Sequence, residues 1–234
     1  MRNLSGGHKM RKIHARACVG TRSVATGKMS VHQSIIWATA PVAPPSAKAS
    51  FLSRRALGRA LALRLLAEIG DGPWAIEADA RGKPLAYGPT TRHVSIAHTG
   101  TVVVAAASKI GPIGIDIERR DPKRDLNRLT LAAFGPAECT AVASHGVSAF
   151  YRIWTIREAI SKATGDGMAL VTDRVDRVPT AMVDGELVAT ADDWLIAHEV
   201  ISRDLSLALA VRVGSRKART AAQACRLGSL RLDP

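Results

Sequence analysis

The sequence has little of what several classes of protein require. Its 234 residues include only three cysteines, Cys18, Cys139 and Cys225. Three scattered thiols are too few for a disulfide framework or a zinc site, so we expect them to be free in a reducing cytoplasm. No apolar run reaches the roughly 18 residues that a membrane-spanning helix needs, and no apolar stretch of a secretory signal is visible. The sequence therefore argues against a secreted disulfide-rich protein and against membrane partners.

Acidic residues are absent from the first 67 positions, which contain twelve lysines and arginines. Residues 68–213 contain sixteen basic and nineteen acidic residues, and residues 214–234 are basic again. The net charge of +13 therefore resides at the two ends of the chain. A nucleic-acid-binding domain carries its basic residues on the folded surface, so nucleic acid is not the expected partner. A basic nucleic-acid-associated protein that acts through its termini is the alternative from another class.

The pattern of apolar residues predicts an α+β fold. Strands and helices segregate along the chain rather than alternate strictly, which argues against a doubly wound sheet. The expected strands span residues 31–39, 74–78, 101–108, 113–118, 194–200 and 205–213, and the expected helices span 51–69 and, with breaks at 135–136 and 144–146, 122–165. The short turn at residues 111–112 predicts that the strands on either side of it pair with each other.

Residues 1–30 lack apolar periodicity and are predicted to lie outside the fold. Their basic composition is typical of a disordered extension, and also of an organelle transit peptide. Translation that begins at Met10 or Met29 is a third possibility. Residues 214–234 form a second basic tail. The folded part is therefore expected within residues 31–213.

Two segments in the centre of the chain carry charged residues at a regular spacing. Asp116 and Glu118 stand two residues apart on a predicted strand, so their side chains point to one face. Glu158 and Lys162 stand four residues apart on a predicted helix and share one side of it. If strand and helix pack together, three carboxylates and one lysine converge. Mg²⁺ is commonly held by a few carboxylates together with substrate phosphates, so this grouping indicates phosphate-transfer chemistry.

Each half of this grouping also has a simpler interpretation. The Asp-x-Glu spacing is frequent in unrelated sequences, and Glu158 with Lys162 has the spacing of an ordinary pair on a solvated helix face. Trp154 lies one turn before Glu158 on the same side, which argues against a fully solvated face. The apolar residues 111–115 predict that Asp116 is buried, and a buried carboxylate needs a cationic partner.

Together these segments resemble the 4′-phosphopantetheinyl transferases, specifically the larger surfactin-type members. The matching motifs are Gly114-Ile115-Asp116-Ile117-Glu118 and Trp154-Thr155-Ile156-Arg157-Glu158-Ala159-Ile160-Ser161-Lys162-Ala163-Thr164-Gly165-Asp166-Gly167. Upstream, in the expected order, stand Gly58-Arg59-Ala60-Leu61-Ala62-Leu63-Arg64, Gly82-Lys83-Pro84 and Val94-Ser95-Ile96-Ala97-His98-Thr99-Gly100. Five ordered motifs over roughly residues 31–213 make the resemblance specific, although each motif alone is weak.

The resemblance implies two similar α+β halves packed as a pseudo-dimer, with boundaries near 31–110 and 111–213 and the site between them. It implies an enzyme, a holo-carrier-protein synthase with Mg²⁺ as cofactor. Such an enzyme transfers the 4′-phosphopantetheine arm of coenzyme A to a serine of an apo acyl or peptidyl carrier protein and releases 3′,5′-ADP. Pseudo-dimeric relatives are self-sufficient, so a monomer is expected. The sequence does not distinguish among the carriers of different pathways.

The resemblance also implies roles for individual residues. Asp116, Glu118 and Glu158 match the metal-binding carboxylates. Glu158 and Lys162 match the catalytic pair, with the serine deprotonated by Glu158 directly or through water. The residues matched to coenzyme A binding are Arg59, Lys83, His98, Arg157 and Lys162. Ala97 stands where the family usually has a serine, and the lost hydroxyl donor is worth about 1 kcal/mol.

Simpler roles remain open for some of these residues. Arg59 shares its helix with other arginines that are typical of a charged surface, and a lone histidine such as His98 is commonly structural. A relative that binds coenzyme A without catalysis is the alternative within the family. The complete set of three carboxylates and Lys162 argues against that alternative.

Overall fold

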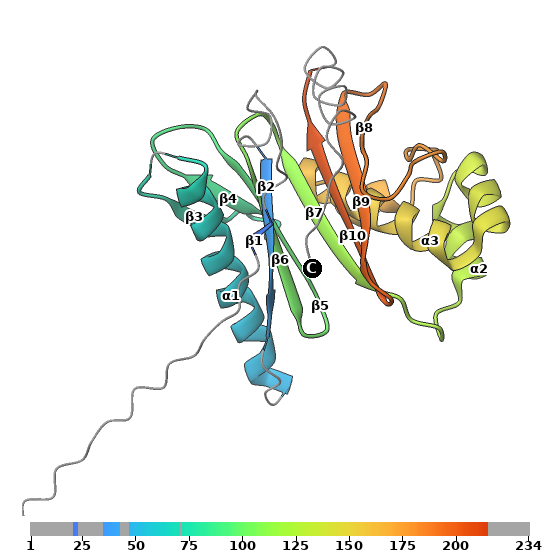
Figure 1. Cartoon of the computed structure of the whole chain (residues 1–234), viewed down its shortest axis with the longest axis horizontal. Helices are drawn as coiled ribbons and strands as arrows, with labels where there is room; N and C mark the ends of the chain where they lie inside the picture. Colours follow the sequence, from blue (N-terminus) through green and yellow to red (C-terminus); the bar gives the residue numbers. More distant parts are fainter. Residues whose placement is uncertain (1–20, 23–34, 43–46, 71, 215–234) are drawn as a thin grey trace, which may run out of the picture.

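The computed structural model describes residues 21–22, 35–42, 47–70 and 72–214. The predicted extension at 1–30 lies outside these residues except for the short strand β1 (Thr21–Arg22), and the predicted tail lies outside them except for Gly214. Within the described ranges, the chain forms two antiparallel four-stranded sheets, a two-stranded hairpin and four helices (Figure 1). No helix in these ranges is both long and apolar enough to cross a membrane.

The first sheet has the strand order β1-β2-β6-β5, with β2 at Ile35–Pro41, β5 at His93–Thr99 and β6 at Val102–Ser108. Helix α1 (Ala47–Glu68) covers one face of this sheet. Its Leu61, Leu65 and Leu66 are buried against alanines of β2 and β6, whose small side chains allow the helix to lie close to the sheet. The hairpin of β3 (Ala75–Ala78) and β4 (Pro84–Tyr87) follows α1 in the chain.

The second sheet has the order β7-β10-β9-β8, with β7 at Ile113–Arg119, β8 at Leu187–Ala189, β9 at Trp194–Ser202 and β10 at Leu205–Arg212. Helix α2 (Leu126–Ala133) leads into the long helix α3 (Pro136–Thr164), which packs on β7 and β10, and the short helix α4 (Met168–Val171) follows. Helix α3 bends at Gly146, and it ends at Gly165, which adopts the left-handed conformation that favours glycine at this position.

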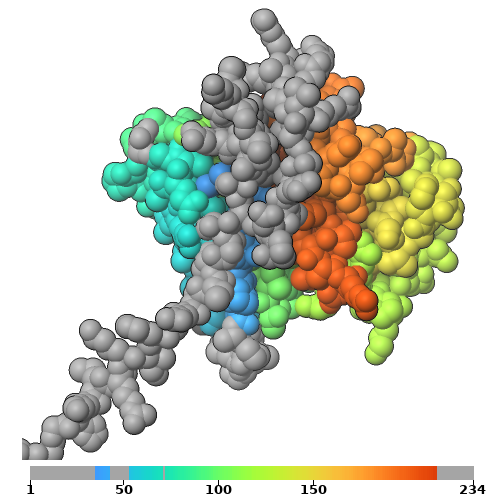
Figure 2. All heavy atoms as spheres, viewed as in Figure 1, coloured from blue at the N-terminus to red at the C-terminus, as the bar shows by residue number. Residues whose placement is uncertain are grey.

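The elements form four layers, with a helix on each outer side and the two sheets facing each other between them (Figure 1). Three apolar cores fill the three spaces between these layers. The middle core contains Ile113, Ile115 and Ile117 of β7 together with Ala97 and Val104 of the first sheet. In the space-filling view, residues of α1 and β3 form one end of the molecule and residues of α2 and α3 form the other (Figure 2).

The edges of the two sheets meet through side chains rather than through a backbone ladder. The Ile115 N–H donates to Ser95 Oγ at 3.1 Å, and the Arg119 N–H donates to Thr99 Oγ1 at 3.3 Å. Because both pairs join residues of β5 and β7 that are 20 positions apart, the two edge strands run side by side in the same direction. These two hydroxyls therefore fix the position of β7 against β5.

The α+β prediction is confirmed, but one predicted pairing is wrong. The strands at 101–108 and 113–118 do not form a hairpin, because β6 pairs with β2 and β5 while β7 pairs with β10. A strand has two edges, and both edges of β6 are already occupied. In the first sheet the last strand in sequence, β6, lies next to β2, and in the second sheet the last strand, β10, lies next to the first strand, β7. The domain boundaries and the pseudo-dimer remain predictions.

Candidate active site

The site begins with the close packing of α3 on β7. Alternate residues of β7, starting at Gly114 and including Asp116 and Glu118, point toward α3. A Cβ atom on Gly114 would lie 1.8 Å from the Ala159 carbonyl oxygen, so only glycine allows the helix to lie this close. This glycine therefore brings the charged residues of β7 within reach of the next helical turn.

Asp116 and Lys162 form the centre of the site. The Lys162 ammonium donates to Asp116 Oδ1 at 2.5 Å, between residues 46 positions apart in the chain. Asp116 is only 5% exposed, and its other carboxylate oxygen, Oδ2, is buried and has no hydrogen-bond donor among the described residues. The predicted convergence of β7 and α3 is therefore present, and one buried acceptor is left over.

Glu118 and Glu158 lie beside this pair. Burial raises the pKa of Glu158 above the ordinary carboxyl value, the negative charge of Asp116 raises it further, and Lys162 acts in the opposite direction. Burial and Asp116 likewise raise the pKa of Glu118, while Arg124 lowers it. Asp116 raises the pKa of both glutamates, so the three carboxyl groups lie close enough to form one electrostatic cluster.

Arg124 lies at one side of the cluster, next to Glu118. Its guanidinium Nη1 lies 3.6 Å from Glu118 Oε2, and the guanidinium carbon lies 5.9 Å from the ring centres of both Tyr151 and Trp154. The two aromatic faces hold the cation in place next to the carboxylate. Glu118 thus has Arg124 as its cationic neighbour, and Asp116 has Lys162.

The cluster opens toward a cavity of about 600 Å³. The cavity is lined by the turn between β3 and β4, by β5, and by the end of α3 with the loop that follows: Arg81, Gly82, Lys83, Pro84, Ser95, Ile96, Glu158, Ser161, Lys162, Gly165, Asp166, Gly167 and Met168. The Lys83 ammonium donates to the Ala163 carbonyl oxygen, and Arg81 donates to the Gly165 oxygen at 3.2 Å. Burial lowers the pKa of Lys83, whereas Asp79 and Asp166 raise it. Two cations of the first half therefore contact the carboxyl end of α3.

His98 and Arg54 approach the cluster from the first half. Burial lowers the pKa of His98, and among the neighbouring charges Arg54 and Lys162 lower it while Asp116 raises it. Arg54 donates to the Gly100 oxygen at 3.3 Å, and its buried Nε has no acceptor among the described residues. Arg54 was not predicted as a site residue, because the sequence of α1 contains four arginines and does not show which of them faces β5.

The structure brings together most of the predicted site residues, but not Arg59. Asp116, Glu118, Glu158 and Lys162 form one cluster, with His98 and Lys83 beside it. Arg59 is exposed on α1, and its guanidinium donates to the Ile76 oxygen at 2.9 Å, on the hairpin strand β3. Its contact is thus with the hairpin and not with the residues that line the cavity.

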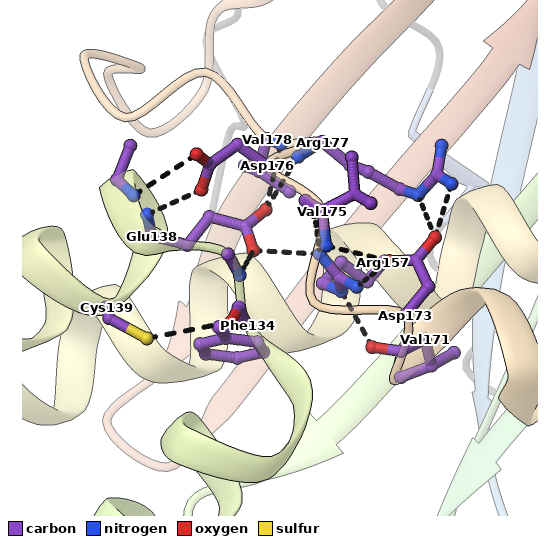
Figure 3. A network of polar contacts seen from close by, with 12 residues as sticks. Phe134, Glu138, Cys139, Arg157, Val171, Asp173, Val175, Asp176, Arg177 and Val178 are labelled. Carbon is purple, nitrogen blue, oxygen red and sulfur yellow. Dashed lines mark hydrogen bonds and ion pairs between the residues drawn. The ribbon is translucent and has the colours of Figure 1, made fainter.

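Arg157 requires a correction. The prediction assigned it to coenzyme A binding, but its side chain is 0% exposed and lies inside a network of polar contacts (Figure 3). It forms ion pairs with Glu138 at 2.8 Å and with Asp173 at 2.7 Å, and it donates to three backbone oxygens, those of Leu170, Val171 and Val175. A guanidinium has five N–H donors, and all five are used here. Arg157 therefore anchors the loop after α4 to α3 and has no donor left for a ligand.

The carboxylate of Glu138, in the same network, is also fully hydrogen-bonded. Besides Arg157, Glu138 accepts hydrogen bonds from the backbone N–H groups of Gly135, Arg177 and Val178 (Figure 3). The network joins the start of α3, its middle and the loop that follows α4. It thereby fixes the helix turn that carries Glu158.

Comparison with known proteins points to one family. Residues 112–210 match the family model described as the 4′-phosphopantetheinyl transferase superfamily. The chain is 28% identical over 149 residues to the 4′-phosphopantetheinyl transferase HetI of Nostoc sp. (strain PCC 7120), which covers 60% of this chain and 61% of HetI. It is 28% identical over 106 residues to the 4′-phosphopantetheinyl transferase AcpT of Salmonella typhi, covering 44% of this chain and 55% of AcpT.

A third relative is the 4′-phosphopantetheinyl transferase of Bacillus subtilis, which is 33% identical over 98 residues, or 39% of this chain and 42% of the relative. The matches to HetI and to the two other relatives span less than two thirds of the length of each. The matched region, residues 112–210, starts just before β7 and contains the three carboxylates and Lys162.

Proposed function

Residues 112–210 belong to the 4′-phosphopantetheinyl transferase superfamily, and on this premise we propose that the chain transfers the 4′-phosphopantetheine arm of coenzyme A to a serine of an apo acyl or peptidyl carrier protein. The reaction would release 3′,5′-ADP. The observation that carries the proposal is the meeting of Asp116, Glu118, Glu158 and Lys162, from β7 and α3, at one side of a cavity lined by cations.

The carboxylate cluster fits a Mg²⁺ ion. Asp116 Oδ2 is a buried acceptor without a donor among the described residues, and Glu118 and Glu158 lie beside it. Hard divalent cations prefer such oxygen ligands. The described residues do not already form a set of three groups that holds a metal ion, so the carboxylates would have to adjust on binding. When bound, the ion would supply Lewis-acid stabilisation of the charge on the pyrophosphate.

The cations near the cavity fit the phosphates of coenzyme A. Lys83 and Lys162 line the cavity, and His98 lies close enough to both Lys162 and Arg54 to feel their charges. Positive groups that are fixed before the reaction stabilise charge that develops during it, without the cost of reorientation. We propose Arg54, rather than Arg59, as the arginine of α1 that contacts the ligand.

Glu158 is the proposed general base. Its raised pKa makes its carboxylate a better proton acceptor than an ordinary carboxylate. In the proposed step, the serine oxygen forms a bond to the phosphorus atom that carries the pantetheine arm, and the serine proton passes to Glu158. The bond from that phosphorus to the bridging oxygen of 3′,5′-ADP breaks. Lys162 donates a hydrogen bond to the leaving phosphate.

Intact-mass spectrometry tests this function. An apo carrier protein is incubated with the chain, coenzyme A and Mg²⁺, with EDTA added in a parallel sample. We expect the carrier to gain one phosphopantetheine arm, EDTA to suppress the gain and Asp116→Ala to abolish it. A folded protein that modifies no fatty-acid, polyketide or peptide carrier would refute the proposal and favour a relative that binds coenzyme A without catalysis.

A matched pair of variants tests the arginine assignment. Arg54→Gln should raise the KM for coenzyme A about tenfold or more, since a hydrogen bond to a charged group is worth about 1.5–3 kcal/mol. Arg59→Gln on the same helix should change it by less than about twofold, because its contact is with Ile76. If Arg59→Gln raised the KM and Arg54→Gln did not, Arg59 would be the arginine that contacts coenzyme A.

We further propose that the chain acts as a monomer in the cytoplasm, where coenzyme A and carrier proteins meet. Both sides of the cavity come from one chain, since Lys83 and Ser95 lie before residue 110 and Lys162 lies after it. Size-exclusion chromatography with light scattering measures the mass directly, and an active dimer would contradict the monomer.

A further inference from the structure

Lys162 occupies two environments at once. Its ammonium is paired with a buried carboxylate, Asp116, while its side chain is 31% exposed and lines the cavity. A lysine ammonium is a single charge on a flexible four-carbon chain, so it can exchange one anion for another with little movement of the backbone. It therefore has access both to the carboxylate cluster and to the space in which phosphates would bind.

The contact between Lys162 and Asp116 means that the ammonium and a divalent metal ion would compete for the same carboxylate. A divalent ion held by this cluster needs the oxygens of Asp116, yet one of them is already paired with the Lys162 ammonium at 2.5 Å. Two cations on one carboxylate repel each other, and in a partly buried position this repulsion is weakly screened. Within the described part of the chain, no three acidic, histidine or cysteine side chains stand ready to hold a metal ion.

We propose that Lys162 is a tethered cation that blocks metal binding until the phosphates of the substrate draw its ammonium away from Asp116 and into the cavity. This inference rests on the proposed function. Divalent metal and coenzyme A then bind cooperatively, and the metal alone binds weakly. Without the substrate, the Lys162 ammonium would stay on Asp116 and weaken the binding of a metal ion to the carboxylates.

The contacts of the other cavity lysine define a control. Lys83 also lines the cavity, but its ammonium donates to the carbonyl oxygen of Ala163 and not to a carboxylate of the cluster. If positive charge in the cavity opposed the metal in a general way, removing either lysine would strengthen metal binding. If the contact with Asp116 is the cause, only the removal of Lys162 would do so.

Cooperativity of this kind is reciprocal. If coenzyme A raises the affinity for the metal by a given factor, the metal must raise the affinity for coenzyme A by the same factor, and such couplings commonly amount to about 5–150-fold. Part of the coupling comes from direct contact between metal and phosphate. The part that comes from the release of Lys162 should be lost when that lysine is replaced by an uncharged residue.

The test measures metal binding rather than catalysis. Mn²⁺ replaces Mg²⁺ because the paramagnetic resonance signal of the free ion reports its concentration. The full chain is titrated with Mn²⁺, with and without coenzyme A, as wild type, Lys162→Met, Lys162→Arg and Lys83→Met. Binding of coenzyme A alone is measured by calorimetry, and circular dichroism confirms that each variant is folded.

We expect Lys162→Met to bind Mn²⁺ alone about tenfold or more tightly than wild type, with a smaller effect of coenzyme A. Lys162→Arg keeps the tethered charge and should bind Mn²⁺ alone weakly. In the absence of coenzyme A, Lys83→Met should bind Mn²⁺ as wild type does, within about twofold. The inference is overturned if wild type binds Mn²⁺ equally well with and without coenzyme A, and this comparison needs no variant. It is also overturned if Lys162→Met and Lys83→Met strengthen Mn²⁺ binding equally.

These outcomes differ from a failure of the proposed function. If the chain is not a phosphopantetheinyl transferase, the carrier protein gains no mass, whether or not calorimetry shows binding of coenzyme A to the wild type. If the function is right and the inference is wrong, coenzyme A binds and the carrier is modified, but Lys162→Met binds Mn²⁺ alone no more tightly than wild type.

Discussion

Replacing Gly114 by alanine should separate the two elements that form the site. The added Cβ would lie 1.8 Å from the Ala159 oxygen and 2.8 Å from the Ala163 nitrogen, whereas ordinary contacts of a Cβ begin at 3.4 Å. Helix α3 would have to move away from β7 by roughly 1.6 Å, because the atoms in the way belong to the backbone and no side-chain rotation relieves the contact. Overpacking of this kind costs about 1–3 kcal/mol, and we expect the upper end of that range.

The same displacement should affect catalysis. It would move Glu158 and Lys162 away from Asp116, and a misplacement of about 1 Å in an active site can lower the rate about 100-fold. Urea denaturation measures the loss of stability, and the rate of carrier modification by folded protein measures the loss of activity. Ile115→Val is the control, because that side chain points to the opposite face of β7 and should cost only about 0.5–1.5 kcal/mol with the rate unchanged. Wild-type stability and rate in Gly114→Ala would refute this account of the packing.

Three further predictions concern the surroundings of the site. Arg157→Lys keeps the charge but leaves buried carbonyl oxygens and Asp173 without some of their hydrogen-bond donors. It should lower the free energy of unfolding, measured by urea denaturation, by about 3 kcal/mol or more. A free energy equal to that of wild type would show that the network is dispensable. Burial raises the pKa of Glu158 in the folded state, so its ionisation destabilises the fold at neutral pH. Glu158→Gln should therefore raise the melting temperature at pH 7 while it abolishes transfer. The gain should shrink as the pH falls and vanish near pH 3, below the ordinary carboxyl pKa, where the carboxyl is protonated in both states; equal gains at both pH values would contradict this. Ser95→Ala leaves the Ile115 amide without an acceptor and should cost about 1–3 kcal/mol in urea denaturation, whereas Ser95→Thr, which keeps a hydroxyl, should cost less.

The parts of the site that depend on local periodicity could be predicted from the sequence. The alternation of side chains along a strand placed Asp116 and Glu118 on one face, and the turn of a helix placed Glu158 and Lys162 on one side. Both patterns hold over a few residues and do not depend on distant contacts. The ion pair of Asp116 with Lys162 follows once the strand and the helix pack together.

The parts that depend on distant partners could not be predicted in this way. Arg157 is next to Glu158 in the sequence, but one residue turns a helix by about 100°, so it points to a different neighbour. That neighbour is a loop whose Asp173 lies 16 residues further along the chain, and no local pattern announces it. The choice between Arg54 and Arg59 is similar, since both lie on the same basic helix and only the packing against the strands decides which one approaches His98.

The arrangement of the site across the four layers has a consequence for how such sequences can diverge. The carboxylates and Lys162 lie within a continuous stretch of 49 residues, from Gly114 to Lys162, which falls inside the region matched by the family model. The groups that approach them from α1, from the turn between β3 and β4 and from β5 are Arg54, Lys83 and His98, and they are spread over a part of the chain that the family model does not match. A cation needs only to reach the cavity, and many positions on a helix or a turn allow that. The reacting groups must keep their spacing on one strand and one helix. Drift in sequence can therefore accumulate in the part proposed to bind the ligand while the part that carries the carboxylates stays recognisable. If the proposed function holds, exchanging the first part of the chain between relatives should alter affinity without changing the reacting groups.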